Sequence, residues 1–68
     1  MAISITLNGE DRSLPRPMSV AELLAEFKLE AKKIAVERNL EIVPRSAYDT
    51  VTVDSGDRLE IVRFVGGG

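Results

Sequence analysis

The sequence predicts one small α+β domain, in which a mixed sheet of four to five strands carries one main helix on one face. The 68 residues fall below the size of one average domain, so we expect no second domain. Strand-like and helix-like segments follow in the order strand, strand, helix, strand, strand, and this segregated order favours the α+β class. Apolar residues make up 44% and charged residues 29%, which is typical of a packed, water-soluble domain.

The first predicted element is a β-hairpin. Apolar and polar residues alternate over residues 3–7, the period-two pattern of a strand with one buried face. Asn8 and Gly9 follow, and this pair tolerates the positive φ angles of a tight hairpin turn. Residues 10–14 then form the returning strand, which the proline at position 15 ends.

The main helix is predicted over residues 20–27. Ser19 and Glu22 have the spacing of a capping box, in which each side chain satisfies a free backbone N–H at the helix start. Met18 and Leu23 have the spacing of a hydrophobic staple, and the apolar residues of the segment fall on one helical stripe.

The second half of the chain is predicted to be mostly strand. A third strand covers residues 34–39, and residues 40–44 add a short edge segment, because the proline at its end has no N–H for a central ladder. Residues 46–50 are predicted to form a turn. After a second turn at residues 54–57, the longest strand pattern of the chain runs over residues 58–65.

Composition excludes several kinds of function. Cysteine and histidine are absent, which excludes disulfides, thiolate nucleophiles, zinc sites built on these residues and histidine acid–base catalysis. The net charge is −2 and the nine basic residues are scattered, so we expect no nucleic-acid partner. The first residues have the pattern of neither a signal peptide nor a membrane span, so we expect a cytoplasmic protein with no membrane partner.

An acidic group near the last strand is the one candidate metal site. Asp54, Asp57 and Glu60 lie close together in the sequence, but a turn explains the first two without any metal. A full ligand loop is lacking, so we expect no metal.

We also expect a monomer when the protein is free.

The chain ends in Gly66, Gly67 and Gly68, and we expect a folded domain over residues 1–65 followed by a flexible tail over residues 66–68. One hypothesis is a frayed terminus without function. The other is a narrow tail that threads a channel and delivers the carboxylate of Gly68 into another protein's active site. Acyl chemistry there requires a leaving group such as AMP, and the sequence has no ATP-binding motif, so a partner would use the ATP.

The last predicted strand presents apolar residues on both faces. Leu59 and Ile61 share one face, and Val62 and Phe64 share the other. Because one helix covers only one sheet face, Val62 and Phe64 would form an exposed apolar patch beside the tail. We favour a partner-binding surface over a patch that is merely uncovered.

Two blocks carry a resemblance to a known family. Residues 35–45, AVERNLEIVPR, and residues 56–68, GDRLEIVRFVGGG, resemble the middle and C-terminal motifs of the ThiS-type sulfur carrier proteins of thiamine biosynthesis. That family has the ubiquitin-like β-grasp fold and ends in Gly-Gly. The resemblance covers essentially the whole chain.

The resemblance implies a carrier that is not itself an enzyme and binds no cofactor. A ThiF-type adenylating enzyme would use ATP to form an acyl-adenylate on Gly68, and sulfur from a persulfide donor would replace AMP. The resulting thiocarboxylate would donate its sulfur to thiazole synthase. Two other kinds of protein with this fold remain as alternatives. One is the small subunit of molybdopterin synthase, which uses the same thiocarboxylate chemistry, and the other is a ubiquitin-like modifier joined to lysines of other proteins. A third is an interaction module with an inert tail.

Overall fold

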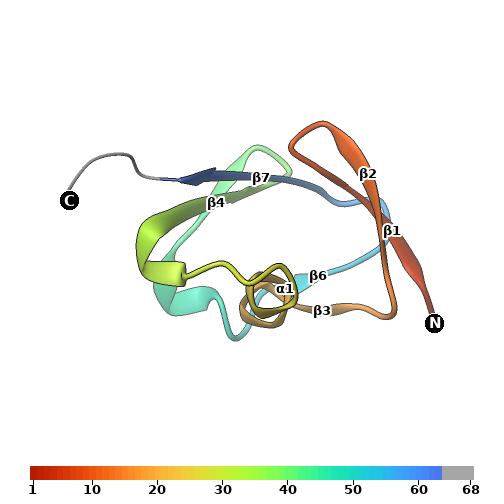
Figure 1. Ribbon diagram of the computed structural model, residues 1–68, viewed down its shortest axis with the longest axis horizontal. Coiled ribbons are helices and arrows are strands. Elements are labelled where there is room, and N and C mark those ends of the chain that lie inside the picture. Colours follow the sequence, from red (N-terminus) through yellow and green to blue (C-terminus); the bar gives the residue numbers. More distant parts are fainter. Residues whose placement is uncertain (64–68) are drawn as a thin grey trace.

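A mixed five-stranded sheet carries one α-helix on one face in the computed structural model, which describes residues 1–63 (Figure 1). This arrangement confirms the α+β prediction. Over these residues the elements are β1 (Ile3–Leu7), β2 (Glu10–Leu14), β3 (Met18–Ser19), α1 (Val20–Glu26), β4 (Ile34–Arg38), β5 (Glu41–Val43), β6 (Thr52–Val53) and β7 (Arg58–Arg63), with 3₁₀ turns at Ala31–Lys33 and Arg45–Ala47. In this part of the chain, no helix is long and apolar enough to cross a membrane.

Strand β7 lies at the centre of the sheet, in the order β2-β1-β7-β4-β5. It runs parallel to β1 and antiparallel to β4, with Ile34 opposite Arg63 and Arg38 opposite Leu59. Strand β5 forms one edge, as the sequence predicts for the segment that ends in a proline. The last described strand therefore lies in the middle of the sheet, with neighbours on both sides.

Strands β3 and β6 form a second, two-stranded sheet that the sequence does not predict. Met18 pairs with Val53, and Ser19 pairs with Thr52. Each strand is only two residues long, so neither has a periodic pattern of its own. Tertiary contact alone brings the two segments together, since both lie beside the start of α1 (Figure 1).

Two hairpins turn through residues with positive φ. Asn8 and Gly9 have φ values of 49° and 81°, which confirms the predicted turn between β1 and β2. Between β4 and β5 the same backbone conformation falls on Asn39 and Leu40, with φ values of 52° and 72°. The predicted strand over residues 34–39 is therefore one residue too long, because Asn39 begins a turn. The turn is hard to recognise in the sequence, because its second residue is a leucine and not a glycine.

The start of α1 is a capping box, as predicted. The Glu22 N–H donates to Ser19 Oγ at 3.1 Å, and the Ser19 N–H donates to Glu22 Oε1 at 2.9 Å. That backbone N–H holds the pKa of the Glu22 carboxyl below its ordinary value. The helix ends at Glu26, one residue before the predicted end, and Phe27 is its C-cap.

The core fills the space between α1 and the inner face of the sheet. Its buried apolar residues come from every layer of the fold: Ile3, Ile5, Leu7, Leu14, Met18, Val20, Leu23, Leu24, Ile34, Val36, Val43, Tyr48, Val53 and Leu59. The sequence analysis did not predict that Tyr48 is buried, because Tyr48 lies in the segment predicted to be a turn. Its carbonyl accepts a hydrogen bond from the Ala21 N–H at 2.8 Å, which ties that segment to the start of α1.

Candidate functional site

The candidate site is the end of β7, from which the chain continues towards the glycines. Of the predicted site residues, Val62 lies on this strand and its side chain is 57% exposed. Leu59 is fully buried and Ile61 is half-buried on the opposite face, as the predicted alternation requires. Phe64, Gly66, Gly67 and Gly68 lie outside the described residues.

Two asparagine side chains hold β7 in place. Asn8 Oδ1 accepts a hydrogen bond from the Ile61 N–H at 2.8 Å, and Asn8 Nδ2 donates to the Ile61 carbonyl at 3.3 Å. Asn39 Oδ1 accepts from the Arg58 N–H at 2.9 Å, while the Asn39 N–H donates to the Arg58 carbonyl at 2.7 Å. Each asparagine thus completes a hairpin and also pairs with the central strand. The sequence identified Asn8 only as a turn residue.

A buried carboxylate, Asp57, joins the start of β7 to the β4–β5 hairpin. Its oxygens accept hydrogen bonds from Arg38 Nε at 2.9 Å, from Asn39 Nδ2 at 3.2 Å and from the Asp54 N–H at 2.8 Å. Burial raises the pKa of the Asp57 carboxyl, but these three donors outweigh burial and hold the pKa below its ordinary value. Asp57 is therefore a charged structural group that the sequence interpretation treated as part of a turn.

Asp57 should make the fold sensitive to acid. Because its pKa is lower in the folded than in the unfolded chain, its contribution to stability is full above the ordinary value of 3.8 and is lost as the pH falls through the folded value. We expect the free energy of unfolding, measured by chemical denaturation from neutral to acidic pH, to fall more steeply for the wild type than for Asp57→Asn. Parallel pH profiles for the two proteins would show that the Asp57 pKa is not lowered.

Acidic residues in the described part do not assemble a metal centre. Residues 1–63 hold no group of three or more acidic side chains placed to bind a metal ion. Asp54 Oδ1 accepts from the Ser55 N–H at 2.7 Å, so this carboxylate caps the turn.

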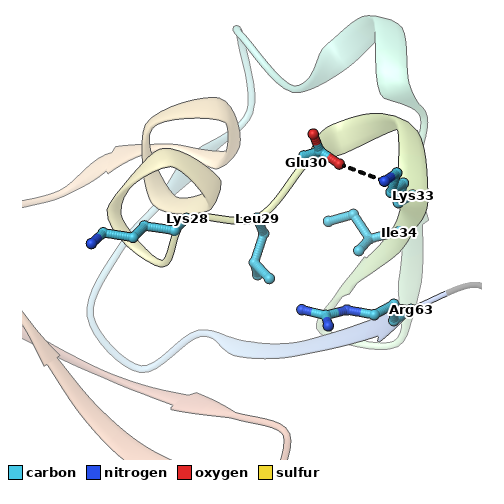
Figure 2. Close-up of a pocket in the computed structure, with 6 residues that line it drawn as sticks. All are labelled: Lys28, Leu29, Glu30, Lys33, Ile34 and Arg63. Carbon is cyan, nitrogen blue, oxygen red and sulfur yellow. Dashed lines mark ion pairs between the residues drawn. The ribbon is translucent and has the colours of Figure 1, made fainter.

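The two faces of the sheet differ at the end of β7. On the helix side, a pocket of about 450 Å³ is lined by Lys28, Leu29, Glu30, Lys33, Ile34 and Arg63. Figure 2 shows the side chains of Leu29, Ile34 and Arg63 directed towards a common space, with Lys28 pointing away. Lys33 Nζ and Glu30 Oε2 form an ion pair at 3.0 Å, which leaves the pocket with an excess of positive charge.

On the other face, Val62 lies directly across from Ala35 of β4. Ile42 of β5 is on the same face and is 69% exposed. Exposed apolar side chains on this face therefore occur on the edge strand β5 as well as on β7. Sequence reasoning missed Ile42, because the face of a three-residue strand is fixed only by its pairing with β4.

Comparisons with known proteins agree with this geometry. The model of the ThiS family matches residues 5–68. The sulfur carrier protein ThiS of Bacillus subtilis is 42% identical over 65 residues, which cover 94% of this chain and 98% of that protein. A thiazole synthase of Paramagnetospirillum magneticum is 52% identical over 66 residues. The matched segment covers 97% of this chain but only 20% of the length of the synthase.

A solved structure shares the fold. The crystal structure of the thiamine biosynthesis protein ThiS from Geobacter metallireducens superposes with a TM-score of 0.86 at 36% identity, covering 97% of this chain and all of that one. The β-grasp fold implied by the two sequence blocks is thereby confirmed. Fold, motifs and relatives coincide over nearly the whole sequence, and the chain belongs to the ThiS family.

Proposed function

We propose that this protein is a sulfur carrier of thiamine biosynthesis, a co-substrate on which partner enzymes act. The observation that carries the proposal is the 42% identity to the Bacillus subtilis sulfur carrier, which spans nearly all of both chains. The sequence contains no cysteine, so a sulfur atom would have to be held on another group. The carboxylate of Gly68 is that group in this proposal.

The proposed cycle begins with adenylation. An oxygen of the Gly68 carboxylate attacks the α-phosphorus of ATP on a ThiF-type enzyme, and pyrophosphate leaves. The terminal sulfur of a persulfide then attacks the acyl carbon and displaces AMP. A thiol reductant cleaves the resulting S–S bond and leaves a thiocarboxylate on Gly68. In this cycle the ATP belongs to the partner, and the carrier itself binds no cofactor.

Thiazole synthase is the proposed acceptor of the sulfur. Two proteins named thiazole synthase contain a segment similar to this chain. The segment is 52% identical in the protein from Paramagnetospirillum magneticum and 36% identical in the one from Magnetococcus marinus. In these relatives a carrier-like segment and a thiazole synthase share one polypeptide. Such covalent linkage raises the effective concentration of one part for the other and is expected when the two act in succession.

Intact-protein mass spectrometry tests the proposal. The protein is incubated with a ThiF-type adenylating enzyme, ATP and a persulfide donor, and the control reaction omits ATP. We expect one oxygen of the protein to be replaced by sulfur only when ATP is present, with the change located at Gly68 by fragmentation. A terminus that stays a carboxylate would contradict sulfur carriage, and a terminus joined to a lysine would instead identify a protein modifier.

The identity of the sulfur acceptor distinguishes the proposed function from the alternative of a molybdopterin synthase small subunit. Thiocarboxylate protein is mixed with thiazole synthase and its substrates, and the return of the ordinary carboxylate is followed by mass. Consumption that depends on thiazole synthase supports the thiamine pathway. Consumption only by the large subunit of a molybdopterin synthase would assign the carrier to that pathway instead.

A further inference from the structure

The sheet face opposite α1 presents exposed apolar and acidic side chains on β7 and on the two strands beside it, β4 and β5. Val62 and Ile42 are 57% and 69% exposed and flank β4, with Ala35 directly across from Val62. We call Ile42, Val62, Glu37 and Glu60 the outer patch. Exposed apolar side chains that gather on one face are typical of a surface that a partner covers.

The two carboxylates of the outer patch face each other. Glu37 and Glu60 are directly opposite in the β4–β7 pairing, and Glu37 is also directly opposite Ile42. Like charges in this position destabilise a sheet, by roughly 0.2–1 kcal/mol for a direct pair. Among residues 1–63, neither carboxylate is in an ion pair with a cation. The two carboxylates thus lie opposite each other without an ion-pair partner among these residues.

The turn between β4 and β5, at the start of β7, holds a strained residue. Leu40 has a φ of 72° and is 75% exposed, so a bulky side chain occupies a left-handed position and contacts little of the fold. The β1–β2 hairpin places Gly9 at the corresponding position of its turn. Backbone strain of this kind costs of order 1–3 kcal/mol and is concentrated at functional sites. This strain lies at the start of β7, where Asn39 pairs with Arg58, and not at the end of the strand that carries Val62. Only the paired carboxylates and the exposed apolar side chains therefore belong to the outer patch.

We propose that the outer patch is the surface on which thiazole synthase docks, through an apolar contact to Ile42 and Val62 and an arginine or lysine placed between Glu37 and Glu60. This inference rests on the proposed function. A guanidinium facing two carboxylates forms strong charge-assisted hydrogen bonds, so docking would turn the repulsion into attraction. The occupant follows from the relatives in which a thiazole synthase is covalently joined to a segment like this chain.

Position along the chain supports the same occupant. Val62 is four residues before Gly66 in the sequence, so a partner held at the outer patch lies beside the described end of β7. The pocket on the helix side has the opposite charge, because Lys28, Lys33 and Arg63 line it. A basic partner surface is therefore attracted to only one face of the sheet at this end.

Charge reversal tests the proposal in the full chain. We compare Glu60→Lys with Asp11→Lys, a matched reversal on the same sheet face but on strand β2, in binding to thiazole synthase by titration calorimetry at several salt concentrations. Asp11 is exposed and lies opposite Thr6 in the β1–β2 pairing. We expect Glu60→Lys to weaken binding about tenfold or more and to reduce the dependence on salt. Asp11→Lys should stay within about twofold of the wild type, because its charge lies away from the patch.

Stability separates docking from folding. Glu60→Lys replaces a like-charge pair with an opposite pair, so the variant should unfold no more easily than the wild type and still bind less well. Ile42→Ser removes an exposed apolar contact and should weaken binding with little change in unfolding. A variant that loses binding only in proportion to its loss of stability would overturn the proposal, and so would equal binding by Glu60→Lys and Asp11→Lys.

Sulfur loading of the same variants keeps this test apart from that of the proposed function. If the wild type is loaded, and all variants are loaded and bind thiazole synthase equally, the docking surface is wrong while sulfur carriage stands. If the wild type is never loaded, sulfur carriage itself fails. If Glu60→Lys and Ile42→Ser lose loading but keep binding to thiazole synthase, the outer patch belongs to the adenylating enzyme and the proposal is overturned.

Discussion

Deletion of Gly68 is expected to abolish thiocarboxylate formation while leaving the fold intact. The deletion withdraws the terminal carboxylate by one residue, a reach of at most about 3.6 Å. A misplacement of only about 1 Å can cost 10²-fold when two reacting groups must be held in line, so a carboxylate short by a full residue should not be adenylated at a measurable rate. The measurement is the fraction of protein carrying sulfur after incubation with the adenylating enzyme, ATP and the persulfide donor.

Folding of the truncated chain is checked by its free energy of unfolding. The buried core described here runs from Ile3 to Leu59, so loss of Gly68 removes none of it. Removal of Met1, which is fully exposed at the other end, is a matched loss of one residue and should leave both loading and stability unchanged. Loading at the wild-type rate without Gly68 would show that Gly67 can serve as the reacting terminus. Unfolding of the truncated protein would show that the tail is part of the fold.

The sequence correctly predicted the elements that depend on residues close together in the chain. The capping box at Ser19, the Asn8–Gly9 turn and the alternation of β1 each depend on residues close in sequence, and all three are present. The turn at Asn39 and Leu40 was missed, because leucine is unusual at positive φ and its cost is tolerated by the surrounding sheet. Prediction failed there because tertiary structure overrides a local preference.

Long-range pairing fixed what the sequence did not reveal. Asp57 contacts Arg38 and Asn39 across the fold, and nothing in the sequence near Asp57 distinguishes a buried carboxylate from a turn residue. For the candidate site, alternation along β7 correctly placed Val62 outward. The neighbours of Val62 could not be predicted, because the register of β7 against β4 decides that Glu37 faces Glu60.

Leu24→Ala should destabilise the fold by about 2–5 kcal/mol, because Leu24 is almost completely buried in the core between α1 and the sheet. A domain of this length has a total stability of roughly 3–10 kcal/mol, so the substitution removes a large share of it. Leu40→Ala is the matched control: the same atoms are deleted at an exposed position with an unchanged backbone requirement, and the effect should lie within about 0.5 kcal/mol. Urea denaturation of both variants measures the difference. Equal effects would mean that burial in this small core does not set its stability. A large effect at Leu24 alone would show that packing of the single helix against the sheet sets the stability of the fold.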